Sequence, residues 1–234
     1  MKSLRLAPLA ASMAALLASL AMTATAQVPP APSEVMAYSG LHAAAQTGDV
    51  AAIVRLSSTS HAALETRDGQ GRTPLHVATF ARQRNAVRTL LEVGANPGAF
   101  ENDRYDAVTI AAVANDEETL RVLLADGASA KLTTSRYDGT ALIAAAHLGH
   151  DAVVRQLIAA GAPLNHVNNL HWTALIEAIV LGDGGASHQR CVQALVDAGA
   201  DMQLTDREGR TPLQLAQGRG YASIARALLG AGAR

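Results

Sequence analysis

The sequence predicts an all-α solenoid, in which short pairs of helices stack side by side in one row. Nearly half of the 234 residues are hydrophobic but only 3% are aromatic, which favours closely packed helices over a β-sandwich. GRTPLHVA at 71–78 also returns as GRTPLQLA at 209–216, and related helix starts lie between them at a nearly constant spacing. A fixed period of this length is typical of stacked repeat units.

The repeat is visible when the chain is aligned with itself on the apolar residue of these helix starts. The aligned residues are separated by 34, 33, 34, 33 and 38 positions, and they are Leu41, Leu75, Val108, Leu142, Leu175 and Leu213. A glycine follows each of the last five at 19 or 24 positions, namely Gly94, Gly127, Gly161, Gly199 and Gly232. The sequence therefore predicts one domain, 38–234, of about six units: 38–67, 68–100, 101–134, 135–167, 168–205 and 206–234.

The second unit shows how one repeat folds. In GRTPLHVATF, Thr73 can cap a helix and Pro74 fits its first turn. Val87 and Leu90 then share one face of a second helix, and Gly94 ends that helix in a left-handed conformation. One such unit cannot bury both apolar faces, but a stack of units can.

These motifs resemble ankyrin repeats. The resemblance rests on DGQGRTPLHVA, DGTALIAAAHLGHDAVVRQLIAAGAPLN and DREGRTPLQLAQGRGYASIARALLGAGA, and it covers about residues 38–234. It implies helix pairs joined by β-hairpin-like fingers. It also implies that His42, His76 and His150 are framework residues, of which His42 and His76 hydrogen-bond neighbouring loops.

Three units depart from the pattern. The first lacks Thr-Pro and ends in SSTSHAALE, as an N-terminal cap would. The third has Asp106 at the threonine position, so we expect a weaker helix start there. The fifth holds five extra residues around 182–190. We interpret this insertion as a flexible excursion, with a secondary contact loop as the alternative.

The N-terminal segment predicts export. Lys2 and Arg5 precede an uncharged run that ends in Ala24-Thr25-Ala26, so residues 1–26 read as a signal peptide cleaved after Ala26. The alternative is an uncleaved membrane anchor. Cleavage places the protein in the periplasm or outside the cell, with no membrane contact. Residues 27–37, the lead-in, are rich in proline and are predicted to be mobile.

No catalytic or cofactor motif is found in the sequence. The net charge of −1 and the lack of like-charge blocks give no reason to expect nucleic acid. His147 and His150 form a pair without a third ligand, so we predict no metal site and no cofactor. Cys191 aligns with the apolar Val153, which favours a buried, inert thiol over a reactive or intermolecular one.

The resemblance implies that fingers and first helices form a concave binding face. The variable positions of this face hold five of the seven aromatic residues: Phe80, Phe100, Tyr105, Tyr137 and Trp172. The variable positions also hold Val113, His147, Leu148, Leu170, Val180 and Leu181, and we call these eleven residues the strip. Aromatic anchors on a rigid surface are typical of protein-binding sites. The alternative is that some of these rings simply pack between adjacent fingers.

We therefore predict a non-enzymatic protein-binding scaffold in a bacterial periplasm. The chain resembles an exported ankyrin group associated with periplasmic catalase and peroxide resistance, which implies support or protection of an exported enzyme. An immunity or inhibitor protein that binds a secreted toxin or enzyme is the alternative. An enzyme built from Asp138, His147 and His171 has no motif in its favour. The polar last helix argues against end-to-end stacking, so we expect a monomer.

Overall fold

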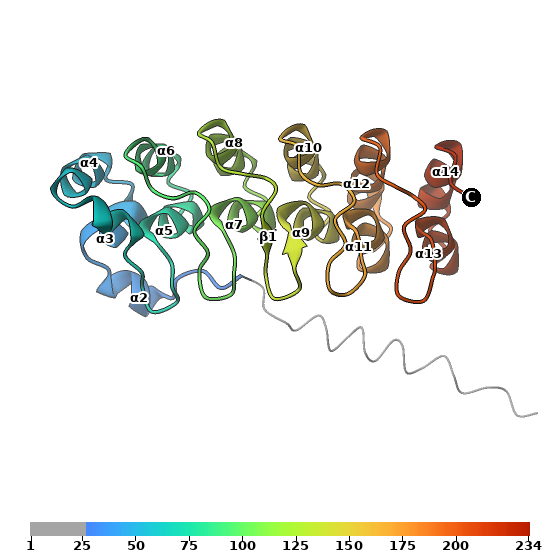
Figure 1. Cartoon of the computed structure of the whole chain (residues 1–234), viewed down its shortest axis with the longest axis horizontal. Helices are drawn as coiled ribbons and strands as arrows, with labels where there is room; N and C mark the ends of the chain where they lie inside the picture. Colours follow the sequence, from blue (N-terminus) through green and yellow to red (C-terminus); the bar gives the residue numbers. More distant parts are fainter. Residues whose placement is uncertain (1–26) are drawn as a thin grey trace, which may run out of the picture.

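The computed structural model describes residues 27–234, which form one elongated row of helix pairs (Figure 1). The predicted all-α solenoid is confirmed. The six pairs, in chain order, are α3 (Gly40–Thr47) with α4 (Val50–Thr59), α5 (Pro74–Phe80) with α6 (Arg84–Glu92), α7 (Ala107–Val113) with α8 (Glu117–Ala125), α9 (Ala141–His147) with α10 (Asp151–Ala159), α11 (Ala174–Val180) with α12 (Ala186–Asp197), and α13 (Pro212–Gly218) with α14 (Ala222–Gly230).

The pairs build two layers of helices with a row of fingers along one edge. The second helix of each pair lies in the outer layer, and the fingers extend below the first, inner helix (Figure 1). A 3-10 turn, His61–Glu65, closes the first unit. The finger before α9 carries a small antiparallel pair, β1 (Thr133–Thr134) with β2 (Gly139–Thr140). Each inner helix packs against the inner helices of the adjacent units, so one core runs through the row.

The residues that defined the repeat are the residues of this core. All six apolar anchors are buried, from Leu41 in α3 to Leu213 in α13. The five repeat glycines all have positive φ angles, between 77° and 99°, as the predicted left-handed helix ends require. The helix start of the third unit, which we expected to be weaker, is capped. Asp106 replaces threonine as the cap and accepts hydrogen bonds from the main-chain N–H and the hydroxyl of Thr109.

The lead-in differs from the mobile segment that its proline content predicted. Residues Pro32–Ala37 form helix α2, and the lead-in runs along the finger side of the first units (Figure 1). Pro32 occupies the first helical position, where its missing N–H costs nothing. Glu34 on this helix makes an ion pair with Arg72 of the second unit, with 2.7 Å between oxygen and nitrogen. The predicted signal peptide, 1–26, lies outside the described residues.

The insertion in the fifth unit also differs from the flexible excursion that we expected. Its residues lengthen the outer helix, because α12 has 12 residues while α10 has 9. His188, on the first turns of α12, bonds the Asp183 carboxylate at 2.8 Å and the main-chain oxygen of His147 at 2.9 Å. The Tyr221 hydroxyl donates to the Gly182 carbonyl at 2.8 Å. The insertion is therefore held from both neighbouring units.

No helix between residues 27 and 234 is long and apolar enough to cross a bilayer.

Candidate protein-binding surface

The concave face consists of the fingers and the exposed sides of the inner helices. Every residue of the predicted strip is at least partly accessible: Leu148 is exposed, and the other ten are half-buried. Phe80, Val113, His147 and Val180 lie at the ends of their inner helices, while Tyr105, Tyr137, Leu170 and Trp172 lie on fingers. The fold therefore positions the strip as a row that follows the repeat.

The lead-in divides this strip into a covered part and an open part. Phe80 and Tyr105 line a small cavity of about 130 Å³ together with Gln27, Val28 and Glu34. The lead-in therefore lies over the face at the second and third units. The strip residues of the fourth and fifth units, including Tyr137 and Trp172, do not line this cavity. They form the open part of the strip.

Two residues of the open part also pack against the core. Trp172 and Val180 are half-buried and contact the buried apolar cluster. Packing against the core therefore explains why part of each side chain is buried, and the remaining part faces outward.

Tyr137 is held differently. The Arg136 guanidinium lies 5.7 Å from the centroid of its ring, and the Tyr137 carbonyl accepts a 3.0 Å hydrogen bond from the Asn169 N–H. Adjacent fingers thus fix the position of Tyr137.

The histidines that the family resemblance assigns to the framework do join units. The Nε2 atoms of His42 and His76 bond the carbonyls of Arg72 and Tyr105, at 2.9 and 3.2 Å. His150 Nδ1 bonds the Ala112 carbonyl at 3.0 Å. Burial lowers the pKa of His76 to about 4, so this imidazole is neutral at physiological pH. These three residues serve the framework of the stack.

A buried carboxyl that sequence reasoning missed lies beside the open part of the strip. Glu177 is on α11, where the corresponding residues of other units, such as Val77 and Ile110, are apolar. Its Oε1 accepts a 2.9 Å hydrogen bond from the Asn168 side chain, and its Oε2 lies 3.5 Å from His147 Nδ1. Burial raises the pKa of Glu177 to about 7. Its polar identity at an apolar position was the signal available in the sequence.

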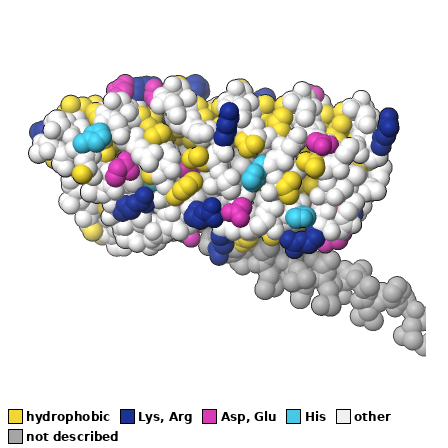
Figure 2. Space-filling model, in the orientation of Figure 1, with side chains coloured by type: hydrophobic (Ala, Val, Ile, Leu, Met, Phe, Trp, Pro, Cys, Tyr) yellow, Lys and Arg dark blue, Asp and Glu magenta, His cyan; other side chains and the backbone are white. Residues whose placement is uncertain are grey.

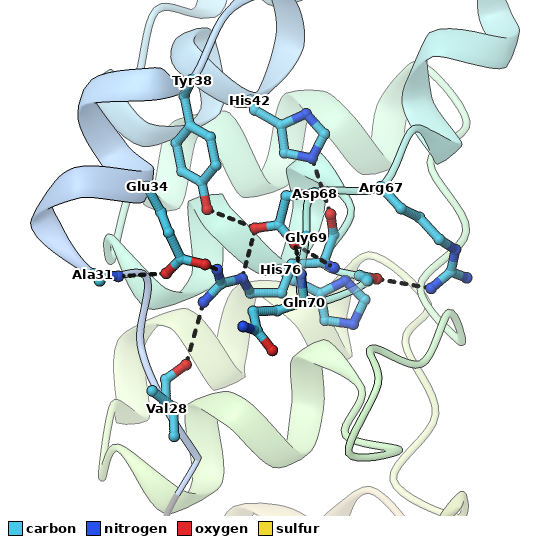
Figure 3. Close-up of polar contacts among 12 residues, drawn as sticks. Val28, Ala31, Glu34, Tyr38, His42, Arg67, Asp68, Gly69, Gln70 and His76 are labelled. Atoms are coloured by element: carbon cyan, nitrogen blue, oxygen red, sulfur yellow. Dashed lines mark hydrogen bonds and ion pairs between the residues drawn. The ribbon is translucent and has the colours of Figure 1, made fainter.

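A buried arginine that was also missed lies under the lead-in. Arg72 is only 1% exposed, and its Nε donates to Asp68 Oδ2 at 2.7 Å. Its other nitrogens reach Glu34 at 2.7 Å and the Val28 carbonyl at 3.3 Å. The Tyr38 hydroxyl donates to the same Asp68 oxygen at 2.7 Å. Figure 3 shows Val28 and Glu34 on the lead-in side and Tyr38 above the Asp68 finger.

The position just before the threonine carries a large side chain in five of the six units: Tyr38, Arg72, Tyr105, Trp172 and Arg210. The arginines at this position indicate carboxylate recognition, as the rings indicate apolar contact.

A second depression lies beside the insertion, on the side of the outer-helix starts. Its volume is about 440 Å³, and its lining includes Leu148, His150, Asp151, Asp183 and His188. Of these lining residues, only Leu148 belongs to the predicted strip.

Between residues 27 and 234, no three His, Cys, Asp or Glu side chains are grouped as a metal ion would require. Figure 2 shows the apolar side chains of the viewed face scattered among charged ones of both signs.

Comparisons with known proteins agree with this geometry. The family description "Ankyrin repeats (3 copies)" matches residues 30–101 and 108–206, and "Ankyrin repeat" matches 208–234. The ankyrin repeat protein YahD of Escherichia coli (strain K12) is 36% identical over 81% of this chain and 94% of its own length.

Two solved structures place the fold among known ones. An ankyrin repeat domain from Acinetobacter baumannii AYE is 44% identical, with a TM-score of 0.76 over 83% of this chain and 98% of its own. A structure described as a predatory endopeptidase from Bdellovibrio bacteriovorus in complex with an immunity protein is 24% identical, with a TM-score of 0.63 over 82% of this chain and 98% of the matched one; it shows the fold alone. The chain therefore belongs to the ankyrin repeat family, whose repeats act as protein-binding scaffolds.

Proposed function

We propose that this protein is a non-enzymatic scaffold that holds a protein partner in its concave face and acts in the periplasm. The observation that carries the proposal is the open part of the strip. Tyr137 and Trp172 are partly accessible on rigid fingers, at positions where the repeat framework does not require aromatic rings. Preorganised aromatic side chains contribute much of the affinity in protein interfaces, because little entropy is lost when they bind.

The proposed location rests on the sequence of residues 1–26, with its basic start, uncharged run and Ala-Thr-Ala end. A test is direct. The mature N-terminus, determined by mass spectrometry of the protein purified from the periplasmic fraction, should be Gln27. Recovery of the full chain from the cytoplasm would contradict export.

The interface test compares two double variants of the mature chain, 27–234. Tyr137→Ala with Trp172→Ala removes the open aromatics. Val54→Ala with Leu229→Ala removes two apolar side chains from outer helices, which are more exposed, at 49% and 52%. Each protein is immobilised and exposed to periplasmic extract, and the captured proteins are identified by mass spectrometry. We expect the wild type and the outer-helix variant to capture the same partner and the strip variant to lose it. Equal capture by all three would contradict the concave face as the binding surface.

Two classes of partner fit such a scaffold. The first is an exported enzyme that the scaffold supports or protects, with a catalase as the candidate that the sequence resemblance implies. The alternative is a secreted toxin or enzyme that the scaffold inhibits as an immunity protein. The activity of the captured protein separates them. A supported enzyme stays active or loses activity more slowly when bound, whereas an inhibited one loses activity in proportion to the bound fraction.

A further inference from the structure

Two units carry nearly the same finger sequence but expose its arginine differently. The second unit reads DGQGRTPL and the sixth reads DREGRTPL. In both, the arginine Nε donates to the first aspartate of its finger, at 2.7 Å for Arg72 and 2.8 Å for Arg210. Arg210 is nevertheless 54% exposed, whereas Arg72 is 1% exposed. The lead-in covers Arg72, and the second unit also has a neighbour on each side, whereas the sixth unit has one on a single side.

The finger sequences explain why Arg72 takes its second carboxylate from outside its own finger. In the sixth unit, Glu208 of the same finger pairs with Arg210 at 3.0 Å. The second unit has the uncharged Gln70 at that position. Glu34 of the lead-in fills this role, and the hydrogen bond from Arg72 lowers the pKa of the Glu34 carboxyl below its ordinary value. Arg72 therefore pairs with Asp68 of its own finger but has room for a second carboxylate, which its own unit does not supply.

The lead-in, which supplies this second carboxylate, is loosely packed. Helix α2 buries none of its residues, and Met36 and Val28 are 82% and 63% exposed. The lead-in also leaves a cavity of about 130 Å³ beside Phe80 and Tyr105, where the side-chain nitrogen of Gln27 is buried without a hydrogen-bond partner. An element that buries little apolar surface and is held by polar contacts has a low free energy of local opening.

We propose that the lead-in is an internal ligand of the concave face, and that the protein partner displaces it by presenting a carboxylate of its own to Arg72. The expected partner feature is an extended segment with an Asp or Glu that pairs with Arg72 and an apolar side chain that fills the cavity at Phe80 and Tyr105. A bound partner then spans the covered and the open parts of the strip. This inference rests on the proposed function, because it names the chemistry by which that face selects its partner.

The first test uses the lead-in as a probe. A peptide of residues 27–38, QVPPAPSEVMAY, carries a fluorophore at its C-terminus, and its binding is followed by anisotropy. The proteins are the mature chain, its Glu34→Gln variant, and a Glu118→Gln variant that removes the carboxylate of an exposed ion pair with Arg121 on an outer helix. The internal lead-in competes at a high effective concentration. In the Glu34→Gln protein the internal lead-in has lost its charged hydrogen bond to Arg72 and competes less well. This protein should therefore bind the peptide about tenfold or more tightly than wild type, and the Glu118→Gln protein should not.

A peptide with Gln in place of Glu34 is the matched control and should bind the Glu34→Gln protein about tenfold more weakly than the Glu34 peptide does. Peptide binding that is equal for wild type and Glu34→Gln, that is absent from both, or that ignores the Glu-to-Gln change in the peptide overturns the proposal.

Release of the lead-in is measured separately, with a dye on Met36→Cys; the natural Cys191 is fully buried and stays unlabelled. The dye should tumble faster when Glu34→Gln is added. Unchanged mobility would show that Glu34 does not hold the lead-in in place.

The last comparison uses the identified partner. We expect it to bind Glu34→Gln about tenfold more tightly than wild type. If the affinity is unchanged while the Tyr137→Ala/Trp172→Ala variant still loses the partner, the displacement fails and the scaffold function stands. If the strip variant also keeps the partner, the scaffold function itself fails.

Discussion

The side-chain amide of Asn168 donates a 2.9 Å hydrogen bond to the carboxyl of Glu177, and both side chains are buried beside the open part of the strip. The opposite oxygen of Asn168 accepts the N–H groups of Leu170 and Trp172, each at 3.0 Å. Glu177 thereby fixes the orientation of the Asn168 amide, and Asn168 fixes the finger that carries Trp172. The position of the aromatic anchor depends on a carboxyl that the solvent scarcely reaches.

This carboxyl should make stability depend on pH. Burial raises the pKa of Glu177 from 4.5 to about 7, so the folded state binds a proton that the unfolded state releases. The stabilising effect is complete below pH 4.5 and is lost as the pH rises through 7. The shift corresponds to about 3 kcal/mol. Glu177→Gln keeps an acceptor for Asn168 and should unfold at a higher temperature than wild type at pH 8, with a smaller difference at pH 5. Parallel pH profiles of the two proteins would contradict this assignment.

The packing of the core is tested by Leu157→Ala. Leu157 lies on α10 and is completely buried, so its truncation leaves a cavity and should lower the free energy of unfolding by about 2–5 kcal/mol. Leu229→Ala is the matched control, because Leu229 on α14 is 52% exposed. We expect a change within about 0.5 kcal/mol there. Urea unfolding of both variants measures the difference, and equal midpoints would mean that the repeat register is wrong.

The packed insertion is tested by two glycine substitutions. A Cβ on Gly182 would fall inside contact distance of the Ala178 carbonyl oxygen and 2.6 Å from a ring carbon of His188. Gly182→Ala should therefore destabilise the protein by about 1–3 kcal/mol. A Cβ on Gly218, in α13, would meet no atom within 4 Å, so Gly218→Ala should stabilise the helix by about 0.5–1 kcal/mol. A harmless Gly182→Ala, measured by thermal unfolding, would indicate that the insertion is loose.

The single thiol is tested by its reactivity. Cys191 is fully buried on α12, and burial raises the pKa of its thiol to about 12. The reactive thiolate is therefore scarce at neutral pH. A chromogenic disulfide reagent should leave the folded protein unmodified for hours and react with one thiol per chain in denaturant. Rapid reaction of the folded protein would support the reactive alternative.

The parts of the fold that follow from local chemistry could be predicted from the sequence. The recurring helix start, which is Thr-Pro-Leu in the second and sixth units, and the left-handed glycine each define a helix end within their own unit, so a single alignment was enough to place the helix pairs. Leu157 is completely buried for the same reason, because its place in the period determines its place in the core.

The features that the sequence did not predict are contacts between residues of different units, and an alignment of the units with one another does not reveal such contacts. Proline content made the lead-in look mobile, and nothing in residues 27–37 reveals that Arg72 lacks a second carboxylate in its own finger. The insertion was interpreted as a flexible excursion because it adds residues to the repeat. Gly182 and Gly184 instead leave room for the rings of His188 and Tyr221. The strip was predicted residue by residue, but its division by the lead-in appears only in three dimensions.

The ion pair between Glu34 and Arg72 has a mechanical consequence for the whole row. In a stack where each unit touches only its neighbours, unfolding starts at the ends. The lead-in begins beside Tyr105 in the third unit, passes the second, and continues into α3 of the first. While it is bound, it links these three units and covers the N-terminal end of the row. The row should therefore fray first from α14, and hydrogen exchange at the N-terminal end should begin with release of the lead-in and only then reach α3.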